Sequence, residues 1–121
     1  MKKERKTVLV FGTFDGLHMG HEFFLNEAGK LGDELVVAVA RDSHVRELKN
    51  KNPVHGEQAR LQAVAKHPGV ARAMLCDETL GSYDILEQVH PTLVAVGHDQ
   101  QALRSDVEKR GVPVIEISKM I

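Results

Sequence analysis

Short apolar runs alternate along the chain with longer segments in which apolar residues recur at helical spacing. The uniformly apolar run 35–40 is typical of a strand that is covered on both faces, as in a parallel sheet. In the first longer segment, Phe24, Ala28 and Leu31 fall on one face of a 3.6-residue repeat. The pattern predicts strands at about 8–11, 35–40, 70–76, 93–96 and 112–117, and helices at about 20–31, 43–48, 57–66, 82–89 and 101–110.

This alternation of strands and helices indicates an α/β fold with a mainly parallel sheet. We predict a single Rossmann-like domain over residues 1–121, with five strands in the flavodoxin-like order 3-2-1-4-5 and helices on both faces. The last strand contains Pro113, which places it at a sheet edge. Ligands of such sheets bind beyond the carboxyl ends of the strands, where the strand order reverses. The segments that follow the first, second and fourth strands are therefore the candidates for function.

Composition narrows the classes of partner. Lys and Arg total 16 against 17 Asp and Glu, for a formal charge of −1, so no general nucleic-acid or membrane surface is expected. The first apolar run, 8–11, is too short for a signal-peptide core or a membrane span. A single cysteine, Cys76, excludes an intramolecular disulfide and fits a reducing, cytoplasmic setting. Any anionic ligand must be bound by a local arrangement of residues.

The segment 12–21, Gly-Thr-Phe-Asp-Gly-Leu-His-Met-Gly-His, follows the first strand and opens the first helix. Glycines there let backbone amides approach phosphate oxygens, and the helix N-terminus favours the same anion. His18 and His21 are three residues apart, so both can face one side and donate hydrogen bonds to a phosphate whose charge increases as pyrophosphate leaves. Two surface histidines, or a metal-binding pair, are the alternative interpretations of this spacing.

Three further segments lie near the same edge of the predicted sheet. Lys49 and Lys51 belong to a basic loop that can reach bound phosphates, or that is simply solvated. Arg60 lies at a helix start, either as a phosphate donor or as an exposed helical arginine. Asp99 follows the fourth strand and either lines the nucleotide pocket or caps the next helix.

The full pattern G-T-F-D-x-x-H-x-G-H resembles the cytidylyltransferase-like nucleotidyltransferases, whose H-x-G-H corresponds to the H-I-G-H element of class I aminoacyl-tRNA synthetases. The E-x-x-R-L segment at 57–61 and the G-x-D-Q segment at 97–100 resemble further elements of that family. The resemblance implies catalytic roles for His18, His21 and Lys49, nucleotide binding by Gly12, Thr13, Phe14, Asp15, His18, Gly20, His21, Gly97 and Asp99, and binding of the acceptor phosphate by Lys49, Lys51 and Arg60.

The resemblance also implies a reaction in which an acceptor phosphate attacks the α-phosphorus of a nucleoside triphosphate and expels pyrophosphate. Mg²⁺ or a similar divalent ion is expected to bridge the triphosphate oxygens, with no metal ligand assigned in the protein. The pattern is most similar to archaeal-type FAD synthases, which use ATP and FMN. Glycerol-3-phosphate cytidylyltransferases, which use CTP, share most elements but have tryptophan where Gln100 stands. A homodimer is implied by the family only.

Members of that family continue past the last strand into a serine- and threonine-rich segment that binds the triphosphate. Here the printed sequence ends at residue 121, and only Ser118 resembles that segment. We therefore expect triphosphate binding with weak turnover by these residues. A nucleotide-binding module with little turnover stays open as an alternative, as does a metal-binding protein, given seven histidines.

Overall fold

The structure, a computed structural model, describes residues 5–117, so the expectation for Ser118 lies outside the described residues. Five strands form one sheet in the order β3-β2-β1-β4-β5, and every strand pair is parallel. This confirms the predicted order and places the last strand at an edge. The strands are β1 (Thr7–Gly12), β2 (Glu34–Val39), β3 (Arg72–Leu75), β4 (Leu93–Gly97) and β5 (Val114–Ile117).

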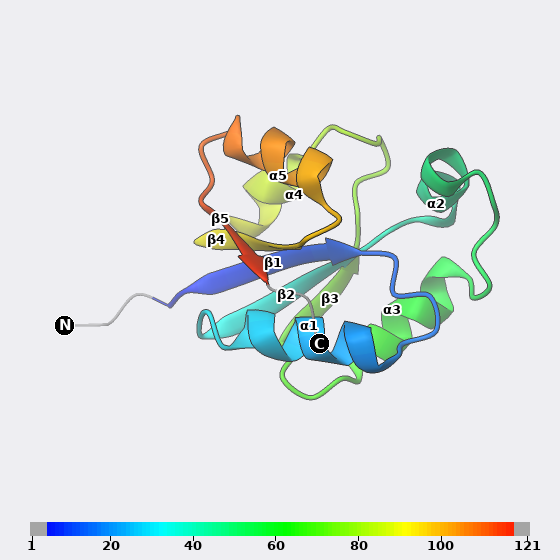
Figure 1. The fold of residues 1–121 in the computed structure, drawn as a ribbon, viewed down its shortest axis with the longest axis horizontal. Helices are drawn as coiled ribbons and strands as arrows, with labels where there is room; N and C mark the ends of the chain where they lie inside the picture. Colours follow the sequence, from blue (N-terminus) through cyan, green and yellow to red (C-terminus); the bar gives the residue numbers. More distant parts are fainter. Residues whose placement is uncertain (1–4, 118–121) are drawn as a thin grey trace.

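Helices cover both faces of the sheet (Figure 1). They are α1 (Met19–Gly29), α2 (Asp42–Lys49), α3 (Glu57–Ala65), α4 (Asp84–Val89) and α5 (Gln101–Glu108). Helices α1 and α3 lie on one face, α4 and α5 lie on the other, and α2 lies beyond the carboxyl ends of the strands. Each helix overlaps its predicted range. Helix α4 begins later than predicted, only after Tyr83, because that residue has a left-handed conformation with φ of 55°.

Alternation along the central strands divides the core into two layers. Val8, Val10 and Val37 face α1 and α3, while Leu9 and Val36 face α4 and α5. All five are fully buried. Because both faces are covered, the strands appear in the sequence as continuous apolar runs rather than as alternating ones.

Strands β1 and β4 separate near their carboxyl ends. Their pairing stops at Val10, whereas β1 stays paired with β2 as far as Gly12. The side chain of Gln100 bridges the opening: its Nε2 donates to the carbonyl of Phe11 at 2.9 Å, and its Oε1 accepts from the amide of Gly97 at 2.9 Å. This is the point where the strand order reverses, so a crevice for a ligand is expected here. Among residues 5–117, no helix is both long and apolar enough to cross a membrane.

Candidate active site

The motif turn, residues 13–18, connects β1 to α1 at the carboxyl edge of the sheet. Phe14 has a φ of 52°, an uncommon value for a residue with a side chain, and its ring is buried in the core. That ring lies across Gly12, where an added Cβ would stand 2.6 Å from a Phe14 carbon. Glycine at 12 and phenylalanine at 14 therefore form one packing unit, which fixes how the chain enters α1.

His18 and His21 form a reciprocal cap at the start of α1. The Nδ1 of His18 accepts from the amides of Gly20, at 3.1 Å, and His21, at 3.4 Å. In return, the amide of His18 donates to the Nδ1 of His21 at 3.3 Å. Such a reciprocal cap gives hydrogen-bond partners to backbone amides that the first helical turn would otherwise leave unpaired. Gly20 makes room for it, because an added Cβ would lie 3.0 Å from a carbon of the His18 ring.

This cap also sets the tautomer of both rings. A nitrogen that accepts a hydrogen bond carries no proton, so in each neutral imidazole the proton is on Nε2. The two rings are stacked, with centroids 3.7 Å apart and planes 20° from parallel. Burial, then the charges of His18 and Lys49, lower the pKa of His21, and Asp15 offsets part of this. The pair therefore presents two Nε2–H donors in the neutral state at the helix N-terminus.

Asp15 connects the motif turn to the α2–α3 loop, residues 50–56. Its carboxylate accepts from the amides of Val54, at 2.7 Å, and His55, at 2.9 Å, and contacts the Nδ1 of His55 at 3.0 Å. Burial raises the pKa of Asp15, but these hydrogen bonds outweigh it and lower the pKa to about 2. The carboxylate is thus bonded to the protein itself, and nucleotide binding by Asp15 stays a prediction.

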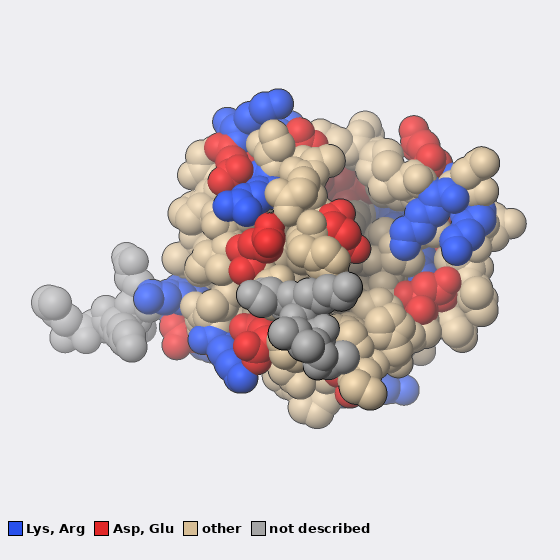
Figure 2. Space-filling model, viewed as in Figure 1, with Lys and Arg blue, Asp and Glu red and all other residues tan. Residues whose placement is uncertain are grey.

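Basic side chains gather over α2 and the loop that follows it, beside a hollow that separates them from α4 and α5 (Figure 2). Arg46 and Lys49 lie in the last turn of α2, and Lys51 is exposed in the α2–α3 loop. The charge of Lys49 contributes to the lowered pKa of His21, so Lys49 lies within electrostatic range of that ring. The structure brings the predicted His18 and His21 into direct contact. Lys51 has no hydrogen bond in the described structure.

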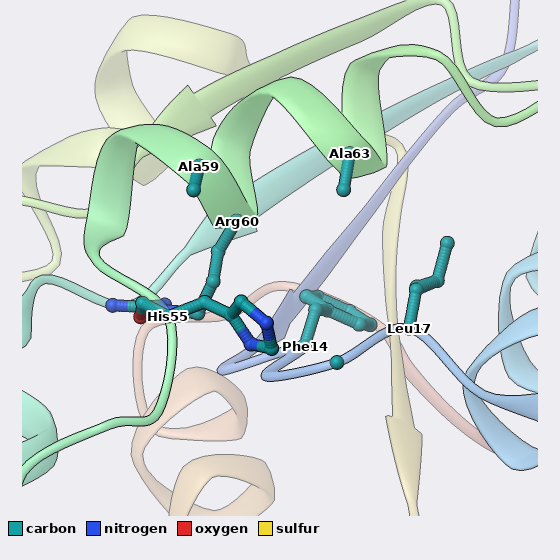
Figure 3. Close-up of a pocket in the computed structure, with 7 residues that line it drawn as sticks. Phe14, Leu17, His55, Ala59, Arg60 and Ala63 are labelled. Atoms are coloured by element: carbon teal, nitrogen blue, oxygen red, sulfur yellow. Dashed lines mark hydrogen bonds between the residues drawn. The ribbon is translucent and has the colours of Figure 1, made fainter.

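Arg60 is buried, so it differs from both of its predicted roles, a phosphate donor facing the site and an exposed helical arginine. Its side chain is fully buried in α3, beside a small cavity of about 190 Å³ that Phe14 and Leu17 help to line (Figure 3). Four hydrogen bonds to the protein occupy its guanidinium: Nε to the carbonyl of His55, Nη1 to the carbonyls of Thr13 and Ala40, and Nη2 to Asp42. A buried charge is stable only when it is paired in this way, so Arg60 joins protein segments instead of binding an acceptor phosphate.

At the end of β4, Asp99 is exposed, but it is not the N-cap of α5. That position belongs to Gln100, whose amide bridges β1 and β4 instead. The sequence places Gln100 in the G-x-D-Q segment without indicating this bridge, and it does not indicate a role for His55. The only available signal for His55 was its place just before the E-x-x-R-L segment, because its contact with Asp15 spans 40 residues. Within the described part of the chain, no three His, Cys, Asp or Glu side chains are grouped to hold a metal ion.

Comparison with known proteins identifies the family. Residues 9–118 match the description "Cytidylyltransferase-like". The chain is 44% identical over 114 residues to an FAD synthase of Methanothermobacter thermautotrophicus, covering 88% of this chain and 74% of that protein. It is 35% identical over 115 residues to an FAD synthase of Thermococcus sibiricus, covering 92% and 78%.

A solved structure gives the same result. The chain is similar to a crystal structure described as a lipopolysaccharide core biosynthesis protein from Thermoplasma volcanium. The TM-score is 0.86 at 37% identity, and the match covers 98% of this chain and 100% of that one. With the family match, the FAD synthase relatives and the stacked H-x-G-H histidines agreeing, the chain belongs to the cytidylyltransferase-like family of nucleotidyltransferases.

Proposed function

We propose that this nucleotidyltransferase transfers AMP from ATP to the phosphate of FMN, forming FAD and releasing pyrophosphate. The observation that carries the proposal is the pair of Nε2–H donors of His18 and His21, fixed at a helix N-terminus within electrostatic range of Lys49. The choice of FMN and ATP is supported by the FAD synthase relatives from archaea.

In this reaction an FMN phosphate oxygen attacks the α-phosphorus of ATP. A new phosphorus–oxygen bond forms as the bond from the α-phosphorus to the bridging oxygen breaks, and pyrophosphate carries that electron pair away. A phosphate monoester is already a competent nucleophile at neutral pH, so the protein needs no general base. Its tasks are to align the two phosphates and to stabilise the charge that accumulates on the leaving pyrophosphate.

Each site residue has one task in this scheme. The motif turn and the N-terminus of α1 bind the triphosphate through backbone amides. The Nε2–H groups of His18 and His21 donate to phosphate oxygens as charge increases, and Lys49 and Lys51 bind phosphate as mobile cations at the rim. Because the Nδ1 atom of each ring accepts hydrogen bonds from the backbone, the pair acts through its Nε2–H groups, and the lysines supply positive charge.

We further propose that Mg²⁺ accompanies the triphosphate. Mg²⁺ is usually bound by substrate phosphates with one or two carboxylates rather than by a protein cage, so the triphosphate would supply most of its ligands. When bound, the ion supplies charge neutralisation on the phosphates.

A matrix of substrates tests the proposal. Pyrophosphate release is measured with ATP, CTP, GTP and UTP, each against FMN, glycerol 3-phosphate and a sugar phosphate, with riboflavin as an acceptor that lacks the phosphate. We expect release with ATP and FMN, none with riboflavin, and FAD as the product by chromatography. Release with CTP and glycerol 3-phosphate, but not with ATP and FMN, would refute the choice of substrates while leaving the transfer chemistry intact.

A further inference from the structure

The Arg60 junction, which comprises Arg60 and its partners Thr13, Ala40, Asp42 and His55, joins separate segments of the site. Thr13 lies in the motif turn, and Ala40 follows the last residue of β2. The hydrogen bonds to these two carbonyls are 2.9 Å and 2.8 Å long. One buried side chain thus fixes the distance between the phosphate-facing turn and the neighbouring strand end.

The same guanidinium contacts both ends of the segment that carries the lysines. Asp42 is the first residue of α2, and its Oδ1 lies 2.7 Å from Nη2 of Arg60. His55 lies at the other end, and its carbonyl accepts from Nε at 2.9 Å. Lys49 and Lys51 stand between these two anchor points, so the position of the basic segment relative to the motif turn depends on Arg60.

Asp15 strengthens this arrangement because it also binds His55, the loop residue that Arg60 contacts. The amide of His55 donates to Asp15, and the carbonyl of His55 accepts from Arg60. Both Asp15 and Thr13 belong to the motif turn, so the end of the α2–α3 loop is bonded to that turn directly and through the guanidinium. In Figure 3 the side chain of Arg60 descends from α3 toward His55 and the turn that carries Phe14.

Burial and charge make arginine necessary at this position. The hydrogen bond from Arg60 lowers the pKa of Asp42, so the pair is ionised near neutral pH. The planar guanidinium carries five N–H groups in a fixed fork and can bind four acceptors that lie in different directions. A lysine carries three donors on one nitrogen at the end of a flexible stem, so it keeps the charge but cannot reproduce this set of contacts.

We propose that Arg60 is a positioning residue for nucleotidyl transfer, because its guanidinium aligns the motif turn with the segment that carries Lys49. The proposal rests on the function proposed above for the same site. Transfer rates depend steeply on alignment, and a displacement of the order of 1 Å costs on the order of a hundredfold in rate. Loss of the junction should therefore reduce kcat more than it weakens triphosphate binding.

The test compares Arg60→Lys with Asp42→Asn, and uses Arg72→Lys as the control because Arg72 is exposed on β3. Each protein is checked for folding by circular dichroism and assayed well below its Tm. We expect Arg60→Lys to lower kcat on the order of a hundredfold with KM for the triphosphate within about threefold of wild type. Asp42→Asn should give a smaller loss of kcat, and the control should give none.

Two readouts without turnover separate positioning from simple destabilisation. Tryptic cleavage after Lys49 and Lys51, measured by mass spectrometry relative to cleavage after Lys66, should accelerate in Arg60→Lys. In Arg60→Ala, millimolar guanidinium ion should restore protection of these sites, and the same concentration of urea should not. If wild type fails to use FMN, the proposed function is refuted, whereas cleavage and guanidinium rescue still decide the role of Arg60. A folded Arg60→Lys with unchanged kcat, or with unchanged cleavage, would overturn the proposal.

Discussion

Replacing His18 by asparagine separates two tasks that the imidazole performs at once. Its Nδ1 accepts from the amides of Gly20 and His21, while its Nε2–H is available to a phosphate. The side-chain oxygen of asparagine occupies the place of Nδ1 along the side chain, and asparagine is among the best N-cap residues. His18→Asn therefore keeps the cap and removes the donor, whereas His18→Ala removes both.

The expected magnitudes differ enough to be resolved. Loss of an N-cap costs about 0.5–2 kcal/mol of stability. Loss of a hydrogen bond made to a developing anion costs about 2.7–4 kcal/mol, or on the order of 10²–10³ in kcat. Both variants should lose turnover to that extent, and His18→Ala should also lose roughly 1 kcal/mol of unfolding free energy, which His18→Asn should retain.

Urea denaturation gives the stability and pyrophosphate release gives kcat, with His67→Asn as a control at a half-buried histidine outside the site whose contact is with Asn26. Triphosphate affinity, measured by calorimetry, should change little in either variant, because the donor acts mainly in the transition state. If His18→Asn keeps turnover within about threefold of wild type, His18 is only a helix cap and the transition-state role is wrong.

Other residues of the site give further predictions. Gly20→Ala should lower kcat, since the added Cβ would stand 3.0 Å from a carbon of the His18 ring and displace that ring; the steady-state assay measures the effect, and an unchanged kcat would contradict this. Replacing Lys49 and Lys51 together by alanine should raise KM for one or both substrates, and added salt should reduce the difference by screening in a titration of ionic strength. The folded-state pKa of His21 lies below its usual value of 6.5. Between these two pKa values the folded state binds fewer protons than the unfolded state, so stability should decrease as the pH falls below 6.5. His21→Asn should lack this dependence when Tm is measured across pH. The pKa of Asp15 is lowered to about 2, so its contribution is present above 3.8 and is lost as the pH falls toward 2; Asp15→Asn should flatten that part of the acid denaturation curve.

The fold could be predicted from the sequence because its signals are local. The apolar runs of the central strands and the 3.6-residue repeat of α1 depend on neighbours within a few positions, and they gave the right elements in the right order. Helix boundaries were predicted less accurately where the conformation of a single residue sets the start of the helix, as Tyr83 does for α4. The placement of His18 and His21 together at the start of the first helix could also be predicted, since the two are close in the sequence, whereas their reciprocal cap was not predicted.

The role of Arg60 could not be predicted in the same way. Its acceptors are the carbonyl of Thr13, 47 residues away, and that of Ala40, 20 residues away, and no local pattern records such pairs. Asp15 has the same property, because its partners in the α2–α3 loop are 39 and 40 residues distant. A charged residue beside a phosphate motif suggests a ligand contact, and only burial shows that the protein itself supplies the partners.

The Arg60 junction also affects how much stability an insertion in the α2–α3 loop would remove. Since Asp42 and His55 are fixed to the same side chain, the stretch between them begins and ends at set points on the molecule. Added residues near Asn52 would lengthen a loop that is already closed, and each doubling of loop length costs only about 0.6 kcal/mol in closure entropy. The length of this loop can therefore vary with little effect on the motif turn, to which His55 stays bonded.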